Sequence, residues 1–150
     1  MMAVCLRYAR HRLEAEDLLQ DSFVRVFNKL HTFRQNGSLE GWIRRITVNI
    51  CIRNYRKFEF SREEIGLENR PEDSEDPEVF GSMGASELME LVQALPDGYR
   101  VVFNLYAVEG YSHKEIAEQL GITVSTSRTQ LLKARKRLQQ QVQELQRVRV

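Results

Sequence analysis

Apolar residues recur every three or four positions along much of the chain, which is the spacing of amphipathic helices. Residues 14–30 follow this pattern closely, and the acidic residues near their start suit the positive end of a helix dipole. The side chains predicted to face the core are Leu19, Phe23, Val26, Phe27 and Leu30. We therefore expect a long amphipathic helix early in the chain.

A second helix is predicted at residues 39–57, with Ser38 as its N-cap. Its core-facing residues would be Trp42, Ile43, Ile46, Ile50 and Tyr55. The other face is basic and has no acidic residue from position 42 onward; its cations are Arg44, Arg45, Arg53, Arg56 and Lys57. Cations bind phosphates, and aromatic rings and Asn amides contact exposed bases. This face therefore predicts a contact with nucleic acid.

The second half of the chain begins with two short predicted helices, at residues 86–95 and 97–108, divided by Pro96. A third helix starts at a capping-box pattern, in which Ser112 caps the helix and Glu115 reaches back to it. These signals give each helix a defined start.

Gly121 and Thr123 mark a turn between two helices. Glycine suits the left-handed residue after a helix, and Thr123 can cap the next helix, which runs at least to Leu138. The residues expected to be buried in this helix pair are Ile116, Ala117, Leu120, Leu131, Ala134 and Leu138. A short helix, a glycine turn and a longer helix form a helix-turn-helix, whose second helix enters the major groove of DNA.

The second helix of this motif has the composition of a DNA-recognition helix. No acidic residue occurs at positions 119–143. Hydroxyl and amide groups in the first turns can reach base edges, and the cations that follow can hold phosphates. The polar and basic residues concerned are Ser125, Thr126, Arg128, Thr129, Gln130, Lys133, Arg135, Lys136 and Arg137. We therefore expect this helix to bind DNA.

Alternating β patterns are nearly absent, so the predicted fold class is all-α. Residues 58–85 are rich in acidic residues, Pro and Gly and have no sustained apolar period, which is typical of a flexible linker. We expect two small helical modules, at residues 1–57 and 86–150, joined by this acidic linker at 58–85.

The net charge of +1 conceals a segregation of charge along the chain. Residues 1–57 hold 11 basic and 5 acidic residues, residues 58–98 hold 2 and 12, and residues 99–150 hold 9 and 4. Two basic blocks on either side of an acidic one suggest two modules that each meet a polyanion, with solvated surface charge as the alternative explanation.

Composition argues against several classes of protein. The longest nearly unbroken apolar stretch, residues 101–108, is far shorter than the roughly 20 residues that cross a bilayer. Residues 1–6 lack the pattern of a signal peptide, so we expect a cytoplasmic protein with no direct membrane insertion. Cys5 and Cys51 are too few for a disulfide scaffold or a four-ligand zinc site, and we expect both to be reduced and buried.

Candidate catalytic and metal-binding groups are sparse. His11, His31 and His113 are scattered and have no carboxylate or Cys partner at ligand spacing. The chain also has no phosphate-binding glycine loop and no nucleophile elbow. We therefore expect no catalytic residue, no metal, no cofactor and no small-molecule substrate.

Several blocks of the chain resemble bacterial RNA polymerase sigma factors of the extracytoplasmic-function type, and together they cover nearly its whole length. Residues 16–27, EDLLQDSFVRVF, resemble the region-two helix that docks on the polymerase. Residues 33–49 resemble the segment that melts the promoter and holds the minus-ten element. The segments that resemble region four, which binds the minus-thirty-five element, are residues 95–100, 111–117 and 134–138.

The resemblance implies roles for individual residues. The polymerase-docking positions are Asp17, Gln20, Asp21 and Phe23. The minus-ten positions are Asn36, Gly37, Trp42, Arg44, Arg45, Asn49, Arg53 and Arg56. Among these, Asn49 would help to hold a base flipped out of the strand.

In the second module the resemblance implies contacts with the minus-thirty-five element. The base-facing positions are Arg128, Thr129 and Leu132. The phosphate-contacting positions are Ser125, Thr126, Gln130, Lys133, Arg135 and Lys136. The implied partners are core RNA polymerase, promoter DNA as a duplex and as a melted strand, and an anti-sigma factor.

The chain departs from the family pattern in three places. The family usually carries one or more helices before the position of Met1, so the resemblance implies that the chain begins partway through the first module. The turn before the recognition helix usually reads Gly-Thr-Val, where this chain has Ser125, Thr126 and Ser127, so a small polar residue replaces a buried valine. Gln130 stands where a base-proximal Arg is frequent. These changes predict weaker or differently specified minus-thirty-five binding.

The alternative function is a self-sufficient dimeric regulator, in which a helical dimerisation module carries the helix-turn-helix. Asn49, with its aromatic and basic surroundings, and the acidic residues at 16–21 favour the sigma factor, because a dimerisation module needs neither. An enzyme acting on nucleic acid is disfavoured because no carboxylate cluster or metal-ligand set is visible.

Overall fold

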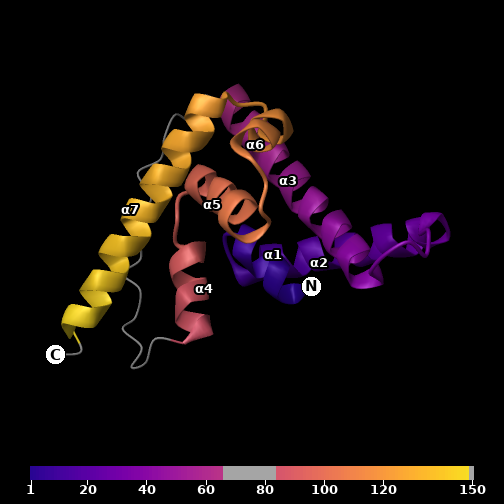
Figure 1. The fold of residues 1–150 in the computed structure, drawn as a ribbon, viewed down its shortest axis with the longest axis horizontal. Helices are drawn as coiled ribbons and strands as arrows, with labels where there is room; N and C mark the ends of the chain where they lie inside the picture. Colours follow the sequence, from indigo (N-terminus) through magenta and orange to yellow (C-terminus); the bar gives the residue numbers. More distant parts are fainter. Residues whose placement is uncertain (66–83, 149–150) are drawn as a thin grey trace. The chain divides into compact units, whose positions relative to one another are not determined.

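The chain folds into two compact units (Figure 1), Met1–Gly66 and Leu67–Val150. The computed structural model describes residues 1–65 and 84–148. Within these residues every regular element is a helix, which confirms the predicted all-α fold class. Among the helices described, none is long and apolar enough to span a bilayer.

Three helices form the first unit. α1 (Met2–Tyr8), α2 (Arg12–Lys29) and α3 (Leu39–Ile65) each contact the other two, and the 3-10 turn η1 (Leu30–Thr32) follows α2. The buried apolar residues at the centre of this unit are Val4, Cys5, Tyr8, Ala9, Ala15, Leu18, Val26, Val48, Cys51 and Ile52. The core thus draws on all three helices, and it includes both cysteines, as the sequence predicted.

The buried face of α2 differs from the one that the sequence predicted. Phe23, Phe27 and Leu30 were expected inside, but they are 47%, 75% and 47% exposed. The residues that α2 buries are Ala15, Leu18, Ser22 and Val26. Leu19 is half-buried, so Val26 alone of the predicted inward residues is fully buried.

Packing geometry explains why α2 presents this face to the core. Small side chains at Ala15 and Ser22 let the backbone of α2 approach its neighbours closely, which large aromatic rings on the same face would prevent. Burial of the Ser22 hydroxyl costs little because it donates a hydrogen bond to the Leu18 carbonyl at 2.7 Å. The aromatic residues are therefore left on the outer side.

The buried face of α3 is likewise offset from the prediction. Its fully buried residues are Thr47, Val48, Cys51 and Ile52, whereas the predicted inward residues are half-buried: Trp42, Ile43, Ile46, Ile50 and Tyr55. The Thr47 hydroxyl donates to the Ile43 carbonyl at 3.0 Å. A polar side chain can therefore occupy the core at this position.

α3 also continues to Ile65, beyond the end predicted near Lys57. The first eight residues of the predicted linker, 58–65, are therefore helical, which corrects the predicted start of the linker. The cation of Arg10 lies 3.9 Å from the ring centroid of Phe58, so this added part of α3 packs on the turn between α1 and α2. The rest of the predicted linker, residues 66–83, lies outside the described residues.

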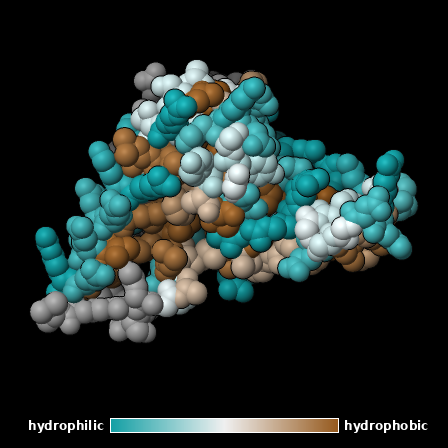
Figure 2. All heavy atoms as spheres, in the orientation of Figure 1, coloured by the Kyte–Doolittle hydropathy of each residue, from teal (hydrophilic) through white to brown (hydrophobic). Residues whose placement is uncertain are grey.

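The second unit is built along α7 (Val124–Val148), on which α4 (Ala85–Gln93), α5 (Asp97–Phe103) and α6 (His113–Leu120) pack. The core between α4 and α7 consists of Leu91, Val92, Leu95, Ala134 and Leu138, with Tyr99, Phe103, Val142 and Leu145 packed around it. Hydrophobic residues gather on the side of α7 that meets α4, whereas hydrophilic residues cover its outer side (Figure 2).

A π-helical turn replaces the second part of the helix that was predicted at residues 97–108. α5 ends at Phe103, and the π-helical turn η2 (Asn104–Val108) follows. The Glu109 amide donates to the Asn104 carbonyl at 3.0 Å, which is the five-residue spacing of a π-helix. Gly110 then reverses the chain with a φ of +80°.

The capping signals around α6 are confirmed. The Glu115 amide donates to the Ser112 hydroxyl at 3.1 Å, and the Ser112 amide donates to the Glu115 carboxylate at 3.2 Å. Gly121 adopts the left-handed conformation with a φ of +68°. Thr123 caps α7, because its hydroxyl oxygen accepts the Thr126 amide at 3.0 Å. α6 and α7 therefore form the predicted helix-turn-helix.

Candidate nucleic-acid interface

One side of α2 exposes acidic and apolar side chains together. Asp17, Gln20 and Asp21 are exposed, and the last two lie three and four positions after Asp17, so all three share one side of the helix. Phe23 lies at the edge of that side. We name seven exposed residues of this side the α2 surface: Leu13, Asp17, Gln20, Asp21, Phe23, Val24 and Phe27. The sequence prediction missed Leu13, Val24 and Phe27 as surface residues.

Four of the predicted minus-ten residues share one exposed stripe of α3. They are Arg45, Asn49, Arg53 and Arg56, named the α3 stripe below, and all four are exposed at spacings of three or four residues. Trp42 begins the same side of the helix and is half-buried, as is Arg44. Three cations and one amide therefore face solvent along about 16 Å of helix.

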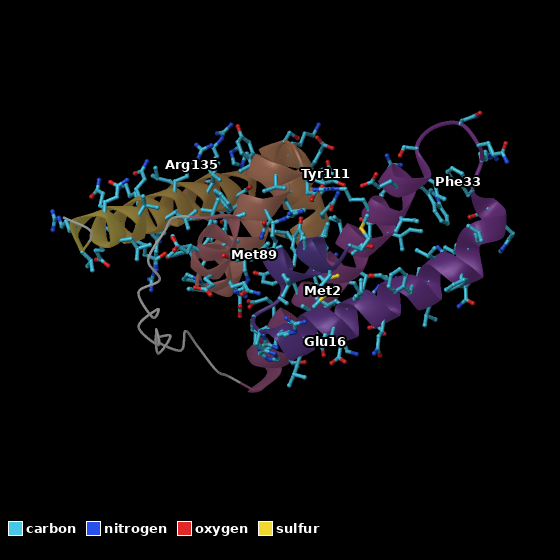
Figure 3. The ribbon with its side chains drawn as sticks, turned by 90° about the horizontal axis from the view of Figure 1, so that it is seen from below. Met2, Glu16, Phe33, Met89, Tyr111 and Arg135 are labelled. Carbon is cyan, nitrogen blue, oxygen red and sulfur yellow. The ribbon has the colours of Figure 1, made fainter. Side chains whose placement is uncertain are left out.

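The loop before α3 is joined to the start of this stripe by aromatic rings. The ring centroids of Phe33 and Trp42 are 5.3 Å apart, and Figure 3 shows Phe33 in the connection between α2 and α3. Asn36 and Gly37 are exposed in the same loop. Gly37 has a φ of +123°, which is accessible to glycine and strained for other residues. The structure thus brings the predicted loop residues near the N-terminal end of the α3 stripe.

α7 exposes eight of the nine residues predicted to contact the minus-thirty-five element. The exposed residues are Ser125, Thr126, Arg128, Thr129, Leu132, Lys133, Arg135 and Lys136. The exception is Gln130, which is half-buried and packs over Gly98 of α5. Its carbonyl oxygen is buried and has no hydrogen-bond partner among the described residues. The Gln130 side chain therefore lies against α5.

A polar and aromatic cluster joins the two helices of the helix-turn-helix. The Nδ1 atom of His113, the first residue of α6, lies 2.8 Å from the hydroxyl oxygen of Ser127 in α7. The His113 ring stacks on Tyr106 of η2, with centroids 4.5 Å apart and planes 16° apart. The Arg135 guanidinium carbon is 5.7 Å from the Tyr106 centroid. We name these four residues the His113 cluster.

The surroundings of His113 disfavour its charged form. Burial lowers the pKa of this imidazole, and the nearby cations of Arg128 and Arg135 lower it further. The sequence pattern indicated a surface or capping role for His113. The contact with Ser127 was missed because the two residues are separated by 14 positions and meet only once the turn has formed.

The two cysteine thiols of the first unit meet in its core. The hydrogen bond from Cys51 lowers the pKa of Cys5, while the same bond and burial raise the pKa of Cys51. Both cysteines are free thiols. Within the described parts of the chain, no three His, Cys, Asp or Glu side chains are grouped so that they could hold a metal ion.

Two family models match the chain in succession. The model described as sigma-70 region 2 matches residues 1–59, and the model described as sigma-70, region 4 matches residues 85–138. The first match contains the α2 surface and the α3 stripe. The second match contains the helix-turn-helix and ends within α7.

Curated relatives bear the names of sigma factors. The RNA polymerase sigma factor YlaC of Bacillus subtilis is 32% identical over 131 residues, which are 83% of this chain and 76% of that protein. The ECF RNA polymerase sigma factor SigW of Bacillus subtilis is 28% identical over 95% of this chain and 82% of that protein. The ECF RNA polymerase sigma factor SigE of Mycolicibacterium smegmatis is 33% identical over 88% of this chain, but the chain spans only 53% of that protein.

A solved structure shares the fold. It is the sigma factor RpoE in complex with the anti-sigma factor NepR from Bartonella quintana, which matches with a TM-score of 0.55 at 23% identity. The match covers 98% of this chain and 89% of that one. At this identity the likeness concerns the helical architecture.

Proposed function

The chain belongs to the RNA polymerase sigma factors, of the extracytoplasmic-function type, and from this premise we propose that it binds core RNA polymerase and directs it to specific promoters. One observation supports this proposal above the others. Each of the two matched regions exposes its own basic helix face, the α3 stripe in the first unit and α7 in the second.

The α3 stripe is the proposed contact with the minus-ten element. Its length of about 16 Å corresponds to about five nucleotides of a strand that rises about 3.4 Å per nucleotide. Arg45, Arg53 and Arg56 would hold the phosphates of the separated strand, while the Asn49 amide would hydrogen-bond to a base turned out of the stack. Trp42 and Phe33 would offer ring faces at the end of the stripe.

α7 is the proposed contact with the minus-thirty-five element. Residues 128–136 span about 12 Å of helix, which is close to the width of the major groove. Arg128 and Thr129 can reach base edges, and Leu132 can contact a thymine methyl group. Lys133, Arg135 and Lys136 would hold phosphates with the hydroxyls of Ser125 and Thr126. Gln130 is not part of this set, because it packs on Gly98.

The α2 surface is the proposed contact with core polymerase. It combines carboxylates with exposed aromatic and aliphatic side chains, which suits an interface with an apolar centre and charged surroundings. Asp17, Gln20, Asp21 and Phe23 are the residues that the family resemblance assigns to this role. We add Phe27, because its side chain is largely exposed on the same face.

Four further parts of the proposal follow from this role. The chain acts where core polymerase acts, in the cytoplasm. It performs no covalent chemistry of its own, so it has no catalytic residue, and bond formation belongs to the polymerase. An anti-sigma factor restrains it, by analogy with the NepR complex of the Bartonella quintana protein. The proposed domain division is region two, linker and region four in that order.

Transcription of genomic DNA in vitro tests the proposal even when no promoter has been identified. Core RNA polymerase from the encoding organism is mixed with the full chain and sheared genomic DNA from that organism, and the 5′ ends of the transcripts are mapped. We expect starts that depend on the chain and share two sequence elements at a constant spacing. An Asn49→Ala variant should lose these starts, while His31→Ala, at an exposed residue of η1, should keep them.

The proposal is overturned if the chain adds no defined start and does not bind core polymerase. Binding of a duplex palindrome by a dimer of the chain would then support the self-sufficient regulator.

A further inference from the structure

Ser127 is a buried polar residue at the start of the recognition helix. Its side chain is 0% exposed, and its hydroxyl lies 2.8 Å from Nδ1 of His113. A buried hydroxyl without a partner is strongly unfavourable, so the bond to His113 is what makes serine acceptable at this position. The two residues therefore depend on each other.

His113 is itself held in place from a second direction. Its ring stacks on Tyr106, which belongs to η2, and Arg135 of α7 lies over the same tyrosine. The His113 cluster thus connects η2, the first residue of α6 and two separate turns of α7. A side chain that is fixed on both sides can define where the helix bonded to it lies.

The bond also lies next to the proposed base contacts. Ser127 directly precedes Arg128, and it follows Ser125 and Thr126, whose side chains are exposed. A displacement of the Ser127 backbone therefore moves the side chains proposed to touch DNA. Because misplacement by about 1 Å is enough to impair a functional site, a weak hydrogen bond here can have a large effect on recognition.

We propose that His113 and Ser127 are a positioning pair, which sets the placement of α7 on the minus-thirty-five element through the hydrogen bond between α6 and α7. Neither side chain needs to touch DNA for this role. The DNA part of the inference rests on the proposed function, whereas the mutual dependence of the two residues does not.

A set of four proteins tests the pair: the wild-type full chain, His113→Phe, Ser127→Val and the double variant. Phenylalanine keeps a ring against Tyr106, and valine fills the buried site without a hydroxyl. Each single change leaves one partner unsatisfied or misplaced, whereas the double change removes both polar groups together, which can be nearly neutral. His31→Phe is the matched control, because His31 is exposed in η1 of the other unit.

The first measurement is independent of transcription. Amide hydrogen exchange of the full chain is measured in α6 and α7 at several urea concentrations, which gives the equilibrium constant for local opening of these helices. Each single variant should raise the local opening constant about tenfold, and the double variant should raise it no more than either single one. Long-range proton–nitrogen NMR spectra of the His113 ring should show the Nδ1 resonance shifted in Ser127→Val. If the effects of the two single variants on the opening constant add up in the double variant, and the Nδ1 resonance of His113 is unchanged in Ser127→Val, the two residues do not act as a pair.

The second measurement examines recognition of DNA. Core polymerase and each variant transcribe two templates, one with a promoter mapped from genomic DNA and one with its minus-thirty-five element scrambled. The measured quantity is the amount of transcript from the intact promoter divided by the amount from the scrambled one. Each single variant should lower this ratio at least fivefold, while transcription of the scrambled template is unchanged. The double variant should restore the ratio to within about twofold of wild type.

The outcomes separate the positioning role from the function as a whole. A merely structural role would lower transcription of both templates equally and leave the ratio unchanged, which would overturn the inference. A wild-type chain that is inactive on every template would overturn the proposed function, and the exchange and NMR measurements would still decide whether the residues depend on each other.

Discussion

α2 of the first unit and α7 of the second both repeat apolar residues at helical spacing, yet they use them differently. α7 buries Leu131 and Leu138 and exposes a row of cations, with Leu132 exposed beside them. α2 buries the small side chains of Ala15 and Ser22 together with Leu18 and Val26, and it exposes four large apolar residues: Leu13, Phe23, Val24 and Phe27. α2 thus carries a row of exposed apolar residues opposite its buried face, whereas the exposed face of α7 is mainly polar and cationic.

The difference indicates what each helix contributes to function. Exposed large apolar residues that share one face usually mark an interaction surface. The α2 surface is therefore suited to a protein partner, and the exposed face of α7 is suited to a polyanion. The two proposed partners of this chain, polymerase and duplex DNA, correspond to these two kinds of surface.

The largest expected effect concerns stability. Leu131→Ala should lower the unfolding free energy of the second unit by about 2–5 kcal/mol, because it leaves a cavity in a packed core. Phe27→Ala in the α2 surface should change stability by less than about 0.5 kcal/mol. Urea unfolding of the full chain, followed by circular dichroism, measures both. Equal losses would contradict the contrast between the two helices.

A second effect is expected in promoter recognition by α7. Arg128→Ala should cost about 1–3 kcal/mol at one base pair of the minus-thirty-five element, if the guanidinium contacts a base. Binding of holoenzyme to promoters substituted at each position measures this cost. Arg147→Ala, near the end of α7 and beyond the matched region, is the control. A uniform loss at all positions would make Arg128 a phosphate contact.

A third effect concerns the α2 surface. Asp21→Arg should weaken binding to core polymerase about tenfold, or about 1.4 kcal/mol, because it reverses an exposed charge in the proposed interface. Titration of fluorescently labelled chain with core polymerase gives the affinity. Glu118→Arg, an exposed carboxylate on α6, is the matched charge reversal and should have little effect. Equal affinities of wild type and Asp21→Arg would count against this surface.

The smallest effect is a pH dependence of the second unit. The pKa of His113 is lower in the folded chain, so near pH ~6.5 the unfolded state binds more protons than the folded state. The contribution of His113 to stability is therefore present above about pH 6.5 and is lost as the pH falls. Urea unfolding at several pH values should show this slope in the wild type, and His113→Phe should reduce it. If the unfolding free energy depends on pH equally in the wild type and in His113→Phe, the pH dependence does not come from His113.

Much of the helix-turn-helix could be predicted from the sequence. The cap at Ser112, the left-handed Gly121 and the cap at Thr123 lie within a few residues of the groups that they satisfy, so local chemistry determines them. Burial of Leu131, Ala134 and Leu138 also followed from their spacing of three and four residues, which places them on one face of α7.

The exposed cations of the candidate site were predictable for a similar reason. A run of basic residues without acidic neighbours has little alternative to solvent, so most of these cations are exposed as their patterns suggest, and only Arg44 and Arg137 among the predicted ones are half-buried. Gln130 differs because a neutral amide can pack against another helix, and only the position of Gly98 shows that it does.

The helical class, the turn between α6 and α7 and the separation of charge could all be predicted from the order of the residues, because each depends on neighbours along the chain. The packing of the helices was needed to show which face of α2 is buried, that Gln130 packs against Gly98, and that the Ser127 hydroxyl contacts His113. A helix with apolar residues on two sides offers two possible faces, and a buried hydroxyl can be satisfied only by whatever lies opposite. Both choices depend on the shape of a partner helix that is distant in sequence.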